Sequence, residues 1–363
     1  MILRLLIGML CLAPFGSSAE TLNVSNFVFR DLDGDGIYEN EDQPFAGATI
    51  LATVGEARIA ATSNLNGFGN FLLGAEASGA DFFEAGEGKV TYDAPAGMFV
   101  STAYPEAVFE VRPVKDSIAG LVVDPPLPFL GLAIEPQLVV YAPGAVSLAC
   151  RGTEDLQNIT FDNRGIAECE IPVEQAHEAW DLTVSFGDSR TVRHEGIVPG
   201  FRKRIMALSA QQTPQDRSQG DRVTFDTVLR TRDVREMPAL ENGLRFHNFV
   251  VAHRRFYGGN GYVNALTSGE YVAYTSSGHP GTISREDGFV PVSMELGYAW
   301  PGARGGHAII EAFRDDHLVH QIKLTLSTDY PVTFMPSWGR VDQLVIRHSS
   351  YWQVLIDDFV YQE

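Results

Sequence analysis

The stretch NFVFRDLDGDGIYENEDQPFAGATI, residues 26–50, decides how the N-terminal part of the chain folds. The side chains of its first four residues, Asn26 to Phe29, have the alternating pattern of a β-strand. The segment that starts at Pro44 begins another strand. An acidic loop, Asp31 to Asp42, lies between them. Because this loop joins two strands rather than two helices, we do not expect a sensor whose helix pair opens on calcium binding.

The loop has the residue spacing of a calcium-binding segment. Aspartates stand at its first, third and fifth positions, and glycine at the sixth allows a sharp turn. A hard cation such as Ca²⁺ takes roughly six to eight oxygen ligands. We expect these ligands to come from the side chains of Asp31, Asp33, Asp35, Glu39 and Asp42 and from the backbone carbonyl of Ile37. The alternative is an acidic turn that holds no ion, because Asp-Gly pairs are common in turns.

Residues 29–54, FRDLDGDGIYENEDQPFAGATILATV, resemble the B-type repeat of SD-repeat bacterial surface adhesins. Two later segments, 62–71 and 93–100, are similar to that family's second turn-and-strand segment and its closing Pro-Gly segment. The resemblance covers residues 24–112 and implies a prealbumin-like β-sandwich that Ca²⁺ stiffens. Related modules carry Lys–Asn isopeptide bonds, but this region has a single lysine, Lys89, late in the unit, so we expect none here.

The rest of the chain also has the pattern of strands. Short β-branched and aromatic runs recur between Gly, Pro, Asn and Asp turns, and helical periodicity is nearly absent. This pattern predicts an all-β protein built from several β-sandwiches. Resemblance to known families implies that the first is prealbumin-like and the last a jelly roll, and we expect an immunoglobulin-like sandwich between them. We expect a signal peptide at 1–19, a calcium-binding sandwich at 20–112, an immunoglobulin-like sandwich at 113–209, a linker at 210–221 and a jelly roll at 222–363.

The strand and turn signatures of residues 222–363 resemble a galactose-binding-like jelly roll found in many exported bacterial proteins. In that family the first and last strands usually pair, which would bring Asp226 near Asp357 or Asp358, and many members hold a structural Ca²⁺ there. The resemblance implies a second calcium site at Asp226, Asn264 and Asp358; the alternative is a set of acidic residues on solvated strand ends. Tyr351 and Trp352 are the candidate sugar-binding residues, because adjacent strand residues point to opposite faces and cannot both enter one core.

The N-terminus has the layout of a secretory signal peptide. Arg4 precedes the short apolar stretch Leu5–Pro14, and small residues precede Glu20. We therefore expect a secreted or periplasmic protein, in the bacterial cell envelope or outside the cell, with no membrane insertion. In such an oxidising compartment Cys150 and Cys169 predict a disulfide bond; the alternative is two free thiols.

Charge and motifs narrow the function. The 363 residues include 27 basic and 46 acidic side chains, a formal net charge of −19, which disfavours nucleic acid as a partner. The sequence has no nucleophile elbow, no His-Glu-x-x-His and no phosphate-binding glycine loop, so we expect no enzymatic activity.

The expected function is calcium-supported adhesion, or binding to a glycan or another surface protein. A carbohydrate-active enzyme with the jelly roll as its catalytic or targeting module is the alternative, and a purely structural role in a cell-surface layer is a third. Oligomeric state stays open.

Overall fold

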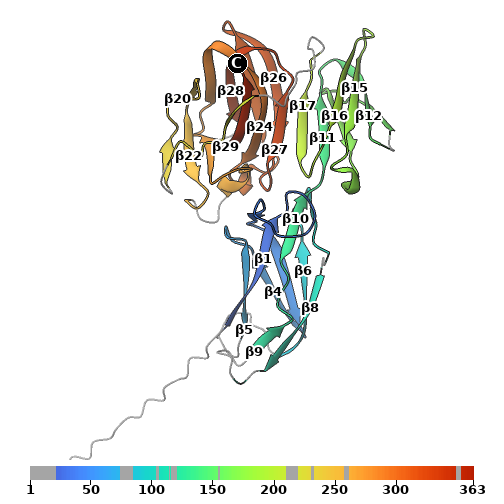
Figure 1. Cartoon of the computed structure of the whole chain (residues 1–363), viewed down its shortest axis with the longest axis vertical. Helices are drawn as coiled ribbons and strands as arrows, with labels where there is room; N and C mark the ends of the chain where they lie inside the picture. Colours follow the sequence, from blue (N-terminus) through green and yellow to red (C-terminus); the bar gives the residue numbers. More distant parts are fainter. Residues whose placement is uncertain are drawn as a thin grey trace, which may run out of the picture.

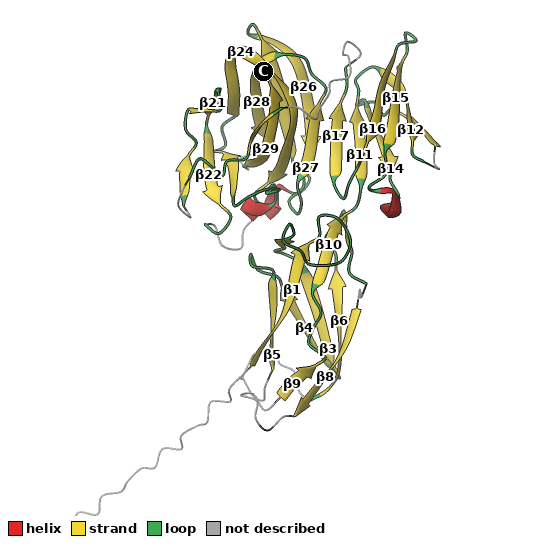
Figure 2. Ribbon diagram, viewed as in Figure 1, coloured by secondary structure: helices red, strands yellow, loops and turns green. Residues whose placement is uncertain are grey.

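The computed structural model describes residues 22–73, 85–103, 106–113, 115, 121–153, 156–209, 220–229, 233–256, 261–348 and 353–363. The expected signal peptide lies outside these residues, as does the expected linker up to residue 219. Within the described ranges, strands dominate, and the helical elements are the short 3-10 turns η1 (Val173–Gln175), η2 (Gly261–Val263) and η3 (Pro301–Ala303). The prediction of an all-β, multi-sandwich protein is confirmed (Figure 2).

The first module, residues 22–134, is a sandwich of two sheets. One sheet has the order β2-β1-β10-β7, with β5 also on β1, and the other has the order β4-β3-β6-β8-β9. Apolar side chains such as Ile50, Val90 and Leu132 fill the space between them. The strands are β1 (Leu22–Arg30), β2 (Gln43–Pro44), β3 (Thr49–Val54), β4 (Ala57–Thr62), β5 (Phe68–Leu73), β6 (Gly86–Asp93), β7 (Met98–Val100), β8 (Glu106–Pro113), β9 (Leu121–Asp124) and β10 (Leu130–Ile134).

This module extends past residue 112, the C-terminal boundary predicted from the sequence. β9 pairs with β8, and β10 pairs in parallel with β1 through Val28–Leu130 and its neighbours. The Pro-rich stretch 124–128 therefore connects two strands of one sandwich and does not separate two units. Since β10 lies beside β1, it supports the strand from which the acidic loop begins.

The middle unit, residues 137–209, is a second sandwich. Its strands are β11 (Gln137–Tyr141), β12 (Ala145–Arg151), β13 (Leu156–Thr160), β14 (Ile166–Glu170), β15 (Trp180–Phe186), β16 (Thr191–Ile197) and β17 (Lys203–Ala207). One sheet has the order β13-β12-β15-β16, and β14, β11 and β17 form the other side. Cys150 on β12 and Cys169 on β14 form a disulfide bond across the two sheets, with their Cα atoms 6.3 Å apart. The predicted disulfide is confirmed.

The C-terminal unit, residues 220–363, is a larger two-layer structure. Its strands are β18 (Asp221–Val223), β19 (Val234–Glu236), β20 (Leu240–Glu241), β21 (Leu244–His247), β22 (Phe249–His253), β23 (Tyr271–Thr275), β24 (Gly281–Tyr298), β25 (His307–Arg314), β26 (His317–Thr325), β27 (Val332–Pro336), β28 (Val341–His348) and β29 (Val354–Gln362). The long strand β24 takes part in both layers, because it pairs with β27 and β29 in one and with β21 and β28 in the other. No helix in the described part of the chain is long and apolar enough to cross a membrane.

The middle and C-terminal units share one sheet. β17 pairs in parallel with β27, so a continuous sheet runs β14-β11-β17-β27-β24-β29-β23-β22-β19 (Figure 1). Ile205 and Ala207 belong to the core of the C-terminal unit, whereas Met206 and Leu208 belong to that of the middle unit. Because successive residues of a strand point to opposite faces, the single strand β17 contributes to both cores.

Candidate metal centre

Asp31, directly after β1, organises the acidic loop. Its side chain is buried, with 1% exposure; Oδ1 accepts the N–H of Gly34 at 2.6 Å, and Oδ2 accepts the N–H of Gly36 at 2.7 Å. Both glycines have left-handed backbone conformations, φ +77° and +78°, which glycine adopts without steric cost. The Asp-Gly-Asp-Gly sequence thus folds into a turn around the first carboxylate.

Asp42 closes the loop by hydrogen bonds to the backbone. Its Oδ1 accepts the N–H of Leu32 at 3.0 Å and its Oδ2 accepts the N–H of Glu39 at 2.9 Å. Ile37 is exposed at 60% and Glu39 is also exposed. The closing residue expected from the sequence therefore holds the two ends of the loop together.

Three carboxylates converge in this loop. Asp31, Asp33 and Asp35 each offer an oxygen, and these oxygens lie within 4.8 Å of one another. Among the described residues, this is the one group of three or more His, Cys, Asp or Glu side chains so arranged. Burial, followed by contacts with the neighbouring aspartates, raises the pKa of Asp33, and the charge of Asp35 contributes most to raising the pKa of Glu39. A cation placed among these groups would relieve their mutual repulsion.

Residues of the middle unit contact the loop. His177 Nε2 donates to the backbone carbonyl of Asp33 at 3.0 Å, and Phe201 lies against Gly34, where an added Cβ would come 2.2 Å from its ring. Phe201 also packs on Phe99 of the first module, with ring centroids 5.7 Å apart. Sequence reasoning missed both contacts, because His177 lies 144 residues from Asp33 and has no local motif.

The residues of the expected second calcium site have separate roles. Asp226 Oδ1 accepts the N–H of Glu270 at 2.7 Å, and the Asn264 amide donates to the carbonyl oxygen of Tyr298 at 2.9 Å. Asp358 accepts the hydroxyls of Thr267 at 2.9 Å and Ser268 at 2.8 Å. The two aspartates thus hold the segment 267–270, while Asn264 is engaged elsewhere.

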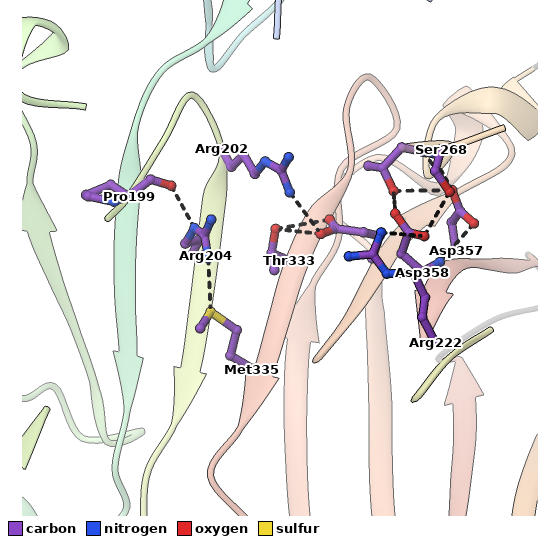
Figure 3. A network of polar contacts seen from close by, with 11 residues as sticks. Pro199, Arg202, Arg204, Arg222, Ser268, Thr333, Met335, Asp357 and Asp358 are labelled. Atoms are coloured by element: carbon purple, nitrogen blue, oxygen red, sulfur yellow. Dashed lines mark hydrogen bonds and ion pairs between the residues drawn. The ribbon is translucent and has the colours of Figure 1, made fainter. Parts of the chain in front are cut away.

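A buried acidic pair lies next to this segment. Strand register places Glu295 on β24 opposite Asp357 on β29. Asp357 Oδ2 accepts the N–H groups of Thr267 and Ser268 at 2.8 and 3.0 Å (Figure 3). Burial and the neighbouring charge of Asp358 raise the pKa of Asp357 to about 8. The sequence offers Asp357 and Asp358 as alternatives beside Asp226, and the predicted second calcium site includes Asp358; only the fold shows that Asp357 is the fully buried one.

Basic side chains from the other units approach the buried acidic pair. Arg202 of the middle unit lies 3.5 Å from Glu295, which also accepts the hydroxyl of Thr333 at 3.0 Å (Figure 3). Arg30, the last residue of β1, is buried as well. Burial and the charge of Arg202 lower its pKa to about 10, while Glu295 and Asp357 act in the opposite direction. All three units therefore contribute charges to this junction.

The expected sugar-binding residues Tyr351 and Trp352 lie outside the described residues. The next residue, Gln353, accepts a hydrogen bond from Trp300 Nε1 at 2.6 Å. Trp300 is 36% exposed and packs edge-on against Tyr262 at 5.9 Å between centroids. An exposed aromatic side chain thus contacts Gln353, the residue that follows the two candidates in the sequence.

No protein-family model and no curated protein matches the chain. Among solved structures it is similar to the Bacillus anthracis TIE protein, with 9% identity over 88% of this chain and 51% of that one and a TM-score of 0.24. It is similar to carbohydrate-binding modules of the β-sandwich superfamily, with 12% identity over 60% of this chain and 86% of that one and a TM-score of 0.15. A Ca²⁺-stabilized adhesin from an Antarctic bacterium that binds ice has 11% identity, 89% and 86% coverage and a TM-score of 0.13.

The chain spans about half the length of the TIE protein chain that it matches. At these identities and TM-scores, the similarities carry no argument about ligand or activity. The resemblances of residues 24–112 to an adhesin repeat and of 222–363 to a galactose-binding-like jelly roll stay predictions.

Proposed function

We propose that this chain is an exported, non-enzymatic calcium-binding protein that attaches to a glycan or a partner protein at or outside the cell surface. The observation that carries the proposal is the convergence of Asp31, Asp33 and Asp35 in one loop, with their oxygens within 4.8 Å of one another. Two oxygens bound to one Ca²⁺ at roughly 2.4 Å each lie at most about 4.8 Å apart, so this spacing fits a shared ion.

Calcium would act as a structural staple at this position. Asp33 and Asp35 are exposed, and the loop also contains Glu39, Glu41 and Asp42, so an ion would cancel repulsion among five or more carboxylates. Glu39 and the carbonyl of Ile37 are the proposed additional ligands. Since His177 and Phe201 contact the same loop, we propose that a bound ion also steadies the contact between the first module and the middle unit.

The binding role is assigned to the C-terminal unit. Its support is the exposed side chain of Trp300, which bonds to Gln353, the residue after Tyr351 and Trp352 in the sequence. Aromatic faces are the usual stacking surfaces for sugar rings. The enzymatic alternative would need paired carboxylates open to a substrate. Glu295 is buried and bonded to Thr333 and Arg202, which favours a structural role for this carboxylate.

Calorimetric titration with Ca²⁺ after chelator treatment tests the metal site. We expect saturable binding and a higher melting temperature in the wild-type protein, and loss of both in Asp33→Asn/Asp35→Asn. The asparagines keep the side-chain oxygens that accept N–H groups of Asp35 and Ile37, so the variant removes charge and preserves the turn. Glu87→Gln/Glu110→Gln is the matched control, since it removes two exposed charges that face each other across β6 and β8. Equal calcium responses in both double variants would disprove the site.

Binding to a panel of polysaccharides, with analysis of released products, tests the attachment role. We expect binding without products, and weaker binding by Trp300→Ala and by Tyr351→Ala/Trp352→Ala. Release of sugars would establish the enzymatic alternative instead. Absence of both glycan and surface-protein binding would favour a purely structural role.

A further inference from the structure

A groove lies where the middle and C-terminal units share their sheet. It has a volume of about 410 Å³, within the range of roughly 300–1,000 Å³ that is typical of ligand sites. Its apolar floor includes Val139, Ile166 and Ile205, from β11, β14 and β17, and its other side is formed by β26. Figure 1 shows the strands β11, β17 and β26. We call this hollow the shared-sheet groove.

The shared-sheet groove exists because the second layer ends at β26. β26 pairs with β25 and, within the described residues, with no other strand. The continuous sheet extends beyond it through β17, β11 and β14, so part of one face of these strands lacks a strand above it. Val139 and Ile205 pack into the neighbouring C-terminal core and also line this groove.

The charge of the groove is opposite to that of the protein. The chain has four lysines in 363 residues and a net charge of −19, yet Lys203 and Lys323 both line this groove. Neither lysine forms an ion pair with a residue in the described part of the chain. Glu168 is the one acidic residue among the described residues that line the groove, and Arg164 is already paired with Asp162 at 2.8 Å. Two lysines that form no ion pair with any described residue thus flank an apolar floor, which suits an occupant with carboxylates.

The groove follows the open edge of β26. Four consecutive residues of this strand, Ile322 to Thr325, line it. Successive strand residues point to opposite faces, so a surface lined by all four follows the edge of the strand and not one of its faces. An open edge presents backbone N–H and C=O groups that an extended peptide can pair with.

We propose that the shared-sheet groove binds an extended acidic segment of a partner protein, which adds to β26 as a further strand. Its apolar side chains would cover the floor on Val139, Ile166 and Ile205, and its carboxylates would meet Lys203 and Lys323. Four lining residues of β26 correspond to a contact about 13 Å long, so a segment of about four to six residues fills it. This site is separate from both the calcium loop and the proposed glycan surface.

Fluorescence anisotropy with labelled peptides of about seven residues tests the proposal. The peptides alternate Asp or Glu with Val, Ile, Leu or Phe, and all measurements contain a chelator so that the calcium site plays no part. We expect saturable binding that weakens as salt is raised, and a loss of about tenfold or more in Lys203→Glu/Lys323→Glu. Lys89→Glu/Lys115→Glu, which makes the same charge change at the other two lysines, should bind like the wild type.

Backbone pairing has its own test. Peptides with N-methyl groups at alternate residues cannot form the strand ladder and should lose binding, and hydrogen exchange at 318–325 should slow when an unmodified peptide binds. The proposal is overturned if the whole peptide set fails to bind, if both lysine double variants bind equally well, or if N-methylated peptides bind undiminished. Binding of polygalacturonate, but of no peptide, would overturn it in favour of an acidic polysaccharide.

Discussion

His177 Nε2 donates a hydrogen bond to the backbone carbonyl oxygen of Asp33, 3.0 Å away, and so joins the acidic loop of the first module to the middle unit. The carbonyl of Asp33 is therefore engaged, while its carboxylate lies with those of Asp31 and Asp35. One short loop consequently takes part both in the candidate metal site and in a contact between units. The order of the loop and the orientation of the first module should depend on each other.

Gly34→Ala should disrupt this contact. The residue has φ +77°, and a Cβ would come 2.2 Å from the ring of Phe201. We expect a loss of about 1–3 kcal/mol in the free energy of unfolding, with weaker calcium binding, because the loop must shift. Denaturant unfolding and calorimetric titration measure the two effects.

Gly55→Ala is the matched control for this experiment. Gly55 also has a left-handed backbone, φ +57°, but no atom lies within 4 Å of an added Cβ. Calcium binding should be unchanged in this variant. If both alanine variants behave alike, the contact with Phe201 has no part in the loop's stability.

Removal of the disulfide should destabilise the middle unit. Cys150 and Cys169 are fully buried and connect its two sheets. Cys150→Ala/Cys169→Ala should lower the free energy of unfolding by about 2–4 kcal/mol in denaturant titrations. A reducing agent should lower the stability of the wild type and leave that of the double variant unchanged; an equal response in both would contradict the assignment.

The middle and C-terminal units should unfold together. β17 supplies Ile205 to one core and Met206 to the other, and it pairs in parallel with β27. Ile205→Ala should cost about 2–4 kcal/mol and shift one calorimetric transition that includes both units. Ile50→Val in the first module is the control and should move a different transition. Separate melting of the two units would show that the shared sheet does not couple them.

The stability of the metal-free protein should depend on Asp357. Its pKa is raised to about 8 in the folded chain, above roughly 3.9 in an unfolded one. Between these values the folded chain retains a proton that the unfolded chain has lost, so the free energy of unfolding falls as pH rises from about 4 to about 8. The slope should be at most ~1.4 kcal/mol per pH unit. Urea titrations in chelator from pH 5 to pH 9 measure it.

Asp358→Asn tests the cause of this pH dependence. The charge of Asp358 helps to raise the pKa of Asp357, and the hydroxyls of Thr267 and Ser268 can rotate to suit an amide. The variant should be more stable than the wild type near pH 8, with the decline ending at a lower pH. Asp188→Asn, at an exposed turn, should leave the profile unchanged. A wild-type profile in Asp358→Asn would exclude this charge as a cause.

The sequence by itself determined the local features of this protein. Alternating apolar residues specify strands, the Asp-Gly spacing specifies a turn around Asp31, and the two cysteines that follow residue 19 specify a disulfide. The strands and the turn depend on residues that are close together in the chain. The disulfide depends on two cysteines, which can pair in one way only. Local spacing was sufficient to predict the three converging carboxylates, because backbone hydrogen bonds within the loop hold them.

Only the tertiary structure decided which segments meet. β10 joins β1 although a Pro-rich stretch precedes it, and β17 joins β27 across more than a hundred residues. The tertiary structure also places His177 on the acidic loop, Glu295 opposite Asp357, and two of the four lysines in the shared-sheet groove. Strand pairing between distant segments depends on which edges and apolar faces remain uncovered once each sandwich has formed, and no local pattern in the chain encodes that.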